Sequence, residues 1–192
     1  ISDDTLIDFT PELRQEALQI IEEFDYGGLY TPPSLNGTIT LPGWTGGAEW
    51  SGAAYDPETS MYYIPSVTSP IVNQLEENNP ADTQFAYQRG GVRTISGPQG
   101  LPLTKPPYGR ISALNLNTAE YDWIRPNAEG IRQQIIDLGI EDPGPVGVPV
   151  VAPLMVTKTL LFQAITDGAP ILRAMDKESG ETIAEIELPG IP

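Results

Sequence analysis

The sequence predicts an all-β fold built from small antiparallel sheets, with one or two short helices in the connections. Three observations favour this fold. A strand–turn–strand pattern recurs at residues 54–60, 113–123 and 174–184. Strand-like stretches, such as residues 61–65 and 109–116, are short and end at turn-forming residues. The chain is also rich in helix breakers, with 19 Gly and 20 Pro in 192 residues.

The repeated pattern predicts sheets that are arranged radially. In each copy a small residue ends a strand, an Asp or Asn caps the turn through its side chain, and a small residue takes the bend. The copies begin at Ala54, Ala113 and Ala174, roughly 60 residues apart, which is a spacing typical of repeated β-sheet blades. Trp123 ends the most complete copy, and we expect its large apolar ring to wedge between neighbouring sheets. Ala184 stands at the corresponding position of the last copy, so that junction is expected to be looser.

Two helices are predicted. Thr10 is a suitable N-cap, Pro11 suits the first helical position, and an apolar stripe continues from there until Gly27 ends the helix. A second, shorter helix is predicted over residues 129–138, where Ile and Leu recur on one face and a Gly follows.

The expected organisation is a single incomplete propeller-like segment over residues 1–192. Residues 1–45 form a helix-containing leading segment, and residues 46–192 form the sheets. Two stretches rich in turn formers, residues 68–107 and 125–150, are predicted to be long loops. Residues 68–107 are expected to lack regular structure, while residues 125–150 include the predicted short helix.

Composition excludes several functions. The formal charge of −16 repels phosphate backbones, so we expect no nucleic-acid partner. The absence of Cys and His excludes disulfides, thiol catalysis, the common zinc sites and His-based catalytic triads. The chain opens with ISDD, without Met or an apolar signal core, and we therefore expect it to be a processed or excerpted piece.

The segment GGAEWSGAAYDP, residues 46–57, is the candidate functional stretch. Its glycines allow positive φ and a close approach to another surface, so Glu49 and Trp50 would be held on a crowded segment. Two interpretations remain open. The segment is either a tight lead-in to a β-hairpin whose Trp50 fills the core, or the wall of a cofactor pocket in which Trp50 packs and Glu49 forms hydrogen bonds.

Several blocks of this sequence resemble the tryptophan-docking blades of the quinoprotein dehydrogenases, which use pyrroloquinoline quinone (PQQ) and fold as an eight-bladed β-propeller. The blocks cover nearly the whole chain in the right order, and two of them, GG-x-x-W and KPPYGR, are fairly specific. The blocks are FTPEL at residues 9–13, YTPPSL at 30–35, GGAEWSGAAYDP at 46–57, GLPLTKPPYGRI at 100–111, VTKTLLF at 156–162 and LRAMDK at 172–177.

This resemblance implies that the chain is a later part of the propeller, with about three to four of its blades. It places the family's catalytic base and calcium ligands upstream, so no catalytic residue and no metal ligand is assigned in this chain. Glu49 matches a position, often Asn, that contacts the quinone, and Trp50 lies beside it. An ionised Glu offers only hydrogen-bond acceptors, so it would need a donor partner or a raised pKa there. Residues 149–151 resemble another stretch near the cofactor.

The leading hypothesis is a fragment of a PQQ- and Ca²⁺-dependent dehydrogenase that oxidises an alcohol or sugar hydroxyl to a carbonyl and passes electrons to an external acceptor. Its partners would be the remainder of the propeller or a complementing chain, and by resemblance it would be periplasmic or otherwise exported. The chain alone is expected to be inactive.

Two other classes remain open. The first is a non-catalytic propeller that serves as a scaffold or binding module. The second is an acidic carbohydrate-binding domain that uses Trp44, Trp50 and Tyr108 as stacking platforms.

Overall fold

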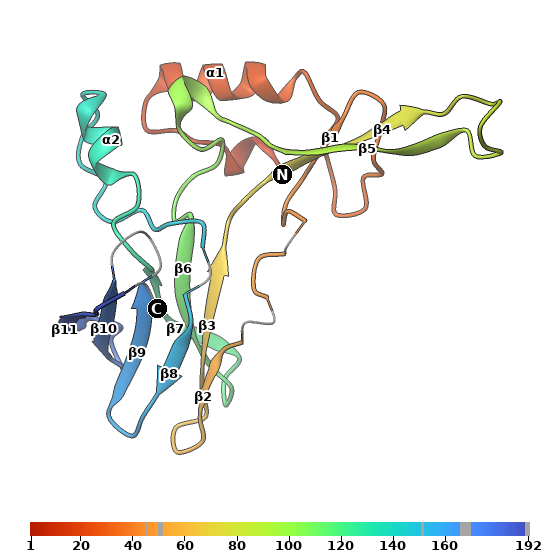
Figure 1. Ribbon diagram of the computed structural model, residues 1–192. Coiled ribbons are helices and arrows are strands. Elements are labelled where there is room, and N and C mark those ends of the chain that lie inside the picture. The colour runs from red at the N-terminus through yellow and green to blue at the C-terminus, as the bar shows by residue number, and fades with distance from the viewer. Residues whose placement is uncertain (45, 50–51, 151, 166–169, 191–192) are drawn as a thin grey trace. The chain divides into compact units, whose positions relative to one another are not determined.

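The computed structural model describes the whole chain except residues 45, 50–51, 151, 166–169 and 191–192 (Figure 1). The chain forms two compact units. The first comprises Ile1–Gly46 and Ser69–Lys105, and the second comprises Gly47–Thr68 and Pro106–Pro192.

The regular secondary structure of the described residues is mostly strand, which confirms the predicted all-β class with short helices. The helices are η1 (Asp3–Thr5), α1 (Pro11–Ile21), η2 (Pro98–Gly100) and α2 (Arg132–Asp137). The strands of the first unit are β1 (Thr38–Thr40), β4 (Ile71–Glu77) and β5 (Tyr87–Thr94). The strands of the second unit are β2 (Ala54–Asp56), β3 (Met61–Val67), β6 (Gly109–Asn115), β7 (Glu120–Pro126), β8 (Leu154–Val156), β9 (Leu160–Ile165), β10 (Ile171–Asp176) and β11 (Thr182–Glu187).

The second unit contains two four-stranded antiparallel sheets with the strand order of propeller blades. One sheet runs β2-β3-β6-β7 and the other runs β8-β9-β10-β11, so each strand pairs with the next along the sheet. In the first of these sheets, Met61 lies opposite Asn115 and Val67 lies opposite Gly109. Burial alternates along β3, as expected for a strand that packs one face against a neighbouring layer.

The turns of the three repeat copies have the predicted chemistry. Asp56, Asn115 and Asp176 each accept a hydrogen bond, through Oδ1, from the backbone N–H two residues later, at 3.0 Å in all three cases. These side-chain caps tighten the turns at the ends of β2, β6 and β10. The sequence prediction of capped strand–turn–strand repeats is therefore confirmed.

Trp123 lies between the two sheets of the second unit, as predicted. Its Nε1 donates to the carbonyl of Lys177 at 3.2 Å, and its ring lies 5.8 Å from the ring of Tyr63. A Cβ added to Gly180 would lie only 2.8 Å from Cε3 of Trp123, so the indole packs directly on the turn between β10 and β11. The surrounding core comprises Ala54, Met61, Tyr63, Ile111, Ala113, Leu161 and Met175.

The first unit contains α1 and a three-stranded sheet in the order β1-β4-β5. The predicted N-cap is confirmed, because Thr10 Oγ1 accepts from the backbone N–H of Leu13 at 3.2 Å. The prediction that residues 68–107 lack regular structure is wrong, because β4 and β5 form an antiparallel hairpin within this range. Exposed polar residues and paired glycines leave β5 without the alternation that marks a strand, and its stability comes instead from pairing with β4.

The second predicted helix is confirmed in part. The structure places α2 at Arg132–Asp137, inside the predicted 129–138. Gly130 has φ of +65°, which is outside the helical region, and this delays the start of the helix.

Candidate functional site

The long connections of the first blade-like sheet meet at one end of that sheet. Because the strands are antiparallel, the start of β2, the end of β3, the start of β6 and the end of β7 lie at the same end. The connections at the opposite end are the short capped turns after β2 and β6. Long connections on a rigid sheet are where binding residues usually lie, so this long-loop end is the candidate site.

Glu49 lies at the long-loop end, on the connection that leads into β2. The backbone N–H of Val67, at the end of β3, donates to the carbonyl of Gly47 at 2.9 Å and ties this connection to the sheet. The Gly52 N–H donates to the Glu49 carbonyl at 3.3 Å, while Glu49 itself is exposed. Gly52 has φ of +101°, and a Cβ added there would meet nothing within 4 Å, so there is open space beside Gly52. The other predicted residue, Trp50, lies outside the described residues.

A second segment, residues 144–150, crosses the same end, and we call it the strap. Its backbone packs directly on the start of β6: a Cβ added to Gly147 would overlap the Gly109 carbonyl oxygen, a clash that only glycine avoids. The Tyr108 N–H donates to the Val146 carbonyl at 2.8 Å. The strap buries residues 146–148 and leaves residues 149–150 exposed beside the sheet end.

Arg110 adds a positive charge near this end. Its Nη1 donates to Thr68 Oγ1 at 2.8 Å and to the Pro107 carbonyl at 2.9 Å, and the structure shows no carboxylate partner for it among the described residues. Partial burial lowers the pKa of Arg110, because the charged form loses solvation.

Two of the proposed sugar-stacking aromatics can be placed. Tyr108 is only 1% exposed, so the prediction that it forms a stacking platform is wrong. Its hydroxyl is buried and has no hydrogen-bond partner among the described residues, and burial raises its pKa. Trp44, in the first unit, is 63% exposed, with the Arg89 guanidinium 4.3 Å from its ring centroid.

A buried ion pair was not foreseen from the sequence. Lys177, on the turn after β10, places Nζ 2.5 Å from Oδ2 of Asp56, the last residue of β2. This contact lowers the pKa of the Asp56 carboxyl, and the hydroxyl of Thr59 and the backbone N–H of Glu58 lower it further against the opposing effect of burial. No sequence signal indicated this pair, because its two residues are far apart in the chain. The sequence pattern also gave Asp56 a different role, as the cap of its turn.

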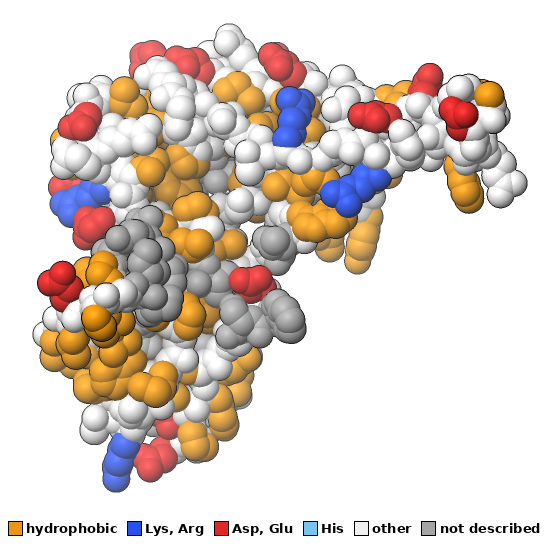
Figure 2. Space-filling view, viewed as in Figure 1, with side chains coloured by type: hydrophobic (Ala, Val, Ile, Leu, Met, Phe, Trp, Pro, Cys, Tyr) orange, Lys and Arg blue, Asp and Glu red, His pale blue; other side chains and the backbone are white. Residues whose placement is uncertain are grey.

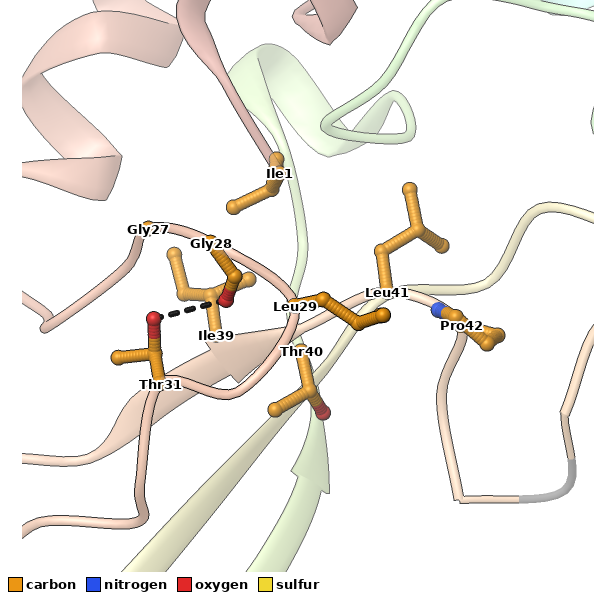
Figure 3. Close-up of a pocket in the computed structure, with 9 residues that line it drawn as sticks. All are labelled: Ile1, Gly27, Gly28, Leu29, Thr31, Ile39, Thr40, Leu41 and Pro42. Carbon is orange, nitrogen blue, oxygen red and sulfur yellow. Dashed lines mark hydrogen bonds between the residues drawn. The ribbon is translucent and has the colours of Figure 1, made fainter.

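The first unit has a separate cavity of about 290 Å³ (Figure 3). Its lining contains no charged side chain, and Thr31 Oγ1 donates across its wall to the Gly28 carbonyl at 2.8 Å. The side chains of the lining are neutral, so they offer no acid–base chemistry. The lining residues are Ile1, Gly27, Gly28, Leu29, Thr31, Ile39, Thr40, Leu41 and Pro42.

Within the described part of the chain, no three acidic side chains come together as a metal site would require. None of the described helices combines the length and the apolar character needed to cross a bilayer. Acidic groups are instead dispersed over the surface, as the red side chains in Figure 2 show for one face.

Comparison with known proteins identifies relatives. The chain is 29% identical over 184 residues to quinoprotein glucose dehydrogenase A of Acinetobacter calcoaceticus, with 88% of this chain and 23% of the relative covered. It is 27% identical to quinate/shikimate dehydrogenase (quinone) of Acinetobacter baylyi, covering 85% of this chain and 23% of the relative. It is also 27% identical to quinoprotein glucose dehydrogenase of Escherichia coli, covering 88% and 24%.

A solved structure of a quinohemoprotein alcohol dehydrogenase from Pseudomonas putida aligns with 79% of this chain and 20% of that chain, at 16% identity and a TM-score of 0.48. The chain spans about a quarter of the length of the three curated relatives. The family described as glucose/ethanol/alcohol dehydrogenase, beta-propeller domain, matches residues 1–191. The capped four-stranded sheets and this match together place the chain in the family of PQQ-dependent dehydrogenase β-propellers.

Proposed function

We propose that this chain is a later part of the propeller of a PQQ-dependent dehydrogenase, and that the whole enzyme oxidises an alcohol or sugar hydroxyl to a carbonyl. The observation that carries the proposal is the match of residues 1–191 to the family's propeller domain. The two capped four-stranded sheets, with their long connections at one end, support it.

The long-loop end offers groups that fit the cofactor. The space beside Gly52 is open, Glu49 is exposed, and Arg110 has a positive charge that would suit the carboxylates of PQQ. An ionised Glu49 only accepts hydrogen bonds, so it suits the pyrrole N–H of the cofactor rather than a quinone oxygen. We assign Trp50 to pack beside Glu49, as the resemblance implies. When bound, PQQ takes up two electrons from the substrate, while the protein supplies orientation and electrostatics.

The remainder of the propeller completes the ring in this proposal, and an external acceptor receives the electrons. Large apolar side chains stay exposed on the outermost strand of each blade-like sheet, Tyr121 and Ile124 on β7 and Ile183 and Ile186 on β11, as expected of faces that neighbouring blades cover. We interpret the contact of Trp123 with Lys177 as the tryptophan-docking contact of the family. Calcium ligands would come from the rest of the propeller, and the enzyme would be exported to the periplasm.

The test is reconstitution of the full-length parent. We expect added PQQ with Ca²⁺ to give dye-linked dehydrogenase activity on at least one member of an alcohol and sugar panel, and no activity when PQQ is omitted. Glu49→Ala should weaken PQQ binding about tenfold, because it removes a charged hydrogen-bond acceptor. Glu58→Ala, on an exposed turn at the opposite end, is the matched control and should bind PQQ normally. Absence of activity across the panel would contradict the proposal.

The alternative function is a propeller scaffold without quinone chemistry. The observation that favours this alternative is Glu49, which places a carboxylate where the family often has an amide. A folded full-length parent that fails to bind PQQ in an absorbance titration would establish this alternative.

A further inference from the structure

Asn127 is a buried amide whose side chain is fully used in holding the strap. It is 2% exposed and lies directly after β7. Its Nδ2 donates to the carbonyls of Val148 at 3.1 Å and Val150 at 2.8 Å, and its Oδ1 accepts from the Val148 N–H at 2.8 Å. Both donors and the acceptor of the amide therefore bind strap backbone.

The backbone of Asn127 joins the strap to both blade-like sheets. Its N–H donates to the Gly109 carbonyl at 3.0 Å, at the start of β6. Its carbonyl accepts from Gln163 Nε2 at 2.5 Å and Arg173 Nη1 at 3.0 Å, on β9 and β10. A buried network with every member paired fixes geometry strongly, since any unpaired member would bear its full desolvation cost.

The same contacts continue to the loop of Glu49. Gly109, which packs on the strap, lies opposite Val67 in the β3–β6 register. Val67 in turn donates to Gly47, two residues before Glu49. The strap and the Glu49 loop are therefore held against the same end of one sheet, and the exposed strap residues 149–150 lie at that end.

We propose that Asn127 is a positioning residue for the cofactor site: it holds residues 149–150 of the strap as a wall beside the Glu49 loop. This inference rests on the proposed function, because it assigns the long-loop end to PQQ. Asn127 itself does not touch the cofactor. It acts through the strap, whose position would shift if the two carbonyls lost their donors.

The test is PQQ titration of the full-length apoprotein, followed by absorbance, with Asn127→Asp. The substitution keeps the shape but sets a carboxylate against two carbonyls, so the strap should move and the dissociation constant should rise at least about tenfold. The absorption maximum of bound PQQ should also shift, and amide hydrogen exchange at Val148 and Val150 should accelerate. Asn127→Ser, which retains one hydroxyl for the strap, should fall between wild type and Asp, and it replaces Asn127→Asp if that variant does not fold.

Two control variants isolate positioning from stability. Asn115→Asp makes the same change at the opposite end, where the equivalent repeat positions are Asp, and should leave PQQ affinity unchanged. Trp123→Phe destabilises the sheet contact without touching the strap, and it too should retain affinity. The positioning role would be overturned if both Asn127 variants bound PQQ as tightly as wild type, or if Trp123→Phe lost as much PQQ affinity as they did. In either case, PQQ binding by the wild type would still uphold the proposed function. A wild-type protein that binds no PQQ would contradict both.

Discussion

Ser60, Ala119 and Gly180 occupy the same left-handed position in the three repeat turns, with φ of 60°, 60° and 72°. A non-glycine residue in this region costs roughly 1–2 kcal/mol, because Cβ crowds the following carbonyl. The recurrence of the conformation in all three copies shows that the turn geometry, set by the Asp or Asn cap, overrides the preference of the residue that takes the bend.

At this position we expect opposite effects from two substitutions. Ala119→Gly should stabilise the protein by about 0.5–1 kcal/mol, because relief of strain exceeds the added unfolded-state entropy. Gly180→Ala should destabilise it by about 3 kcal/mol, because the new Cβ is both strained and pressed against Trp123. Urea denaturation followed by tryptophan fluorescence measures both.

Gly139 provides the matched control for Gly180. It also has positive φ, at +79°, but an added Cβ would meet nothing within 4 Å. Gly139→Ala should therefore cost only the backbone strain. If Gly139→Ala and Gly180→Ala destabilised the protein equally, the packing of Trp123 on the turn would be refuted.

Single residues also show where sequence reasoning stopped. The caps at Asp56, Asn115 and Asp176 were predictable, because a side-chain cap is a local interaction between neighbouring residues. The buried Lys177–Asp56 pair was not, because it joins residues from different sheets. The burial of Tyr108 was missed for the same reason, since the segments that cover it are distant in the chain.

At the scale of elements, Trp123 was the residue from which the packing between two sheets could be predicted. One large aromatic at the end of a repeat predicted a wedge between sheets, and the structure places it there. The β4–β5 hairpin was missed because Gly90 and Gly91 interrupt β5 and its burial does not alternate. Pairing with β4, rather than local preference, creates that strand.

The Lys177–Asp56 pair joins the two blade-like sheets, so its loss should loosen them together. Lys177→Met leaves a carboxylate buried without its partner and should destabilise the protein by about 3 kcal/mol, measured by urea denaturation. Lys158→Met, at an exposed position, is the matched control and should have an effect near zero. An equal, small effect of both substitutions would argue against a role of the pair in holding the sheets.

The same pair sets an acid limit on stability. The pKa of Asp56 is lower in the folded protein than its usual value, so its contribution is fully present above the unfolded pKa of about 3.9. It is lost as the pH falls through the lower folded pKa. The stability difference between wild type and Asp56→Asn should therefore be constant from pH 7 to about pH 4 and shrink at lower pH. A difference that already shrank between about pH 7 and pH 5 would contradict this assignment.

At the scale of the whole molecule, the blade architecture was predictable from a repeated local signal, and the family was predictable from motif blocks that occur in the right order along the chain. The family resemblance implied about three to four blades. The described residues form three sheets, of which two have the four-stranded blade order. The third sheet belongs to a separate compact unit built from segments before and after β2–β3. Discontinuous units of this kind depend on long-range pairing, which periodicity does not reveal.

The chain covers about a quarter of its relatives' length, so we expect the rest of the propeller to complete the cofactor site. The place of Glu49 in that site is therefore best tested on the full-length parent, by an experimental structure determined with PQQ and Ca²⁺. We predict that the Glu49 carboxylate lies within hydrogen-bonding distance, about 3 Å, of a donor group of the cofactor, with the strap residues 149–150 beside it. A structure that placed Glu49 on an outer surface, with PQQ bound by other parts of the protein, would contradict the proposed site.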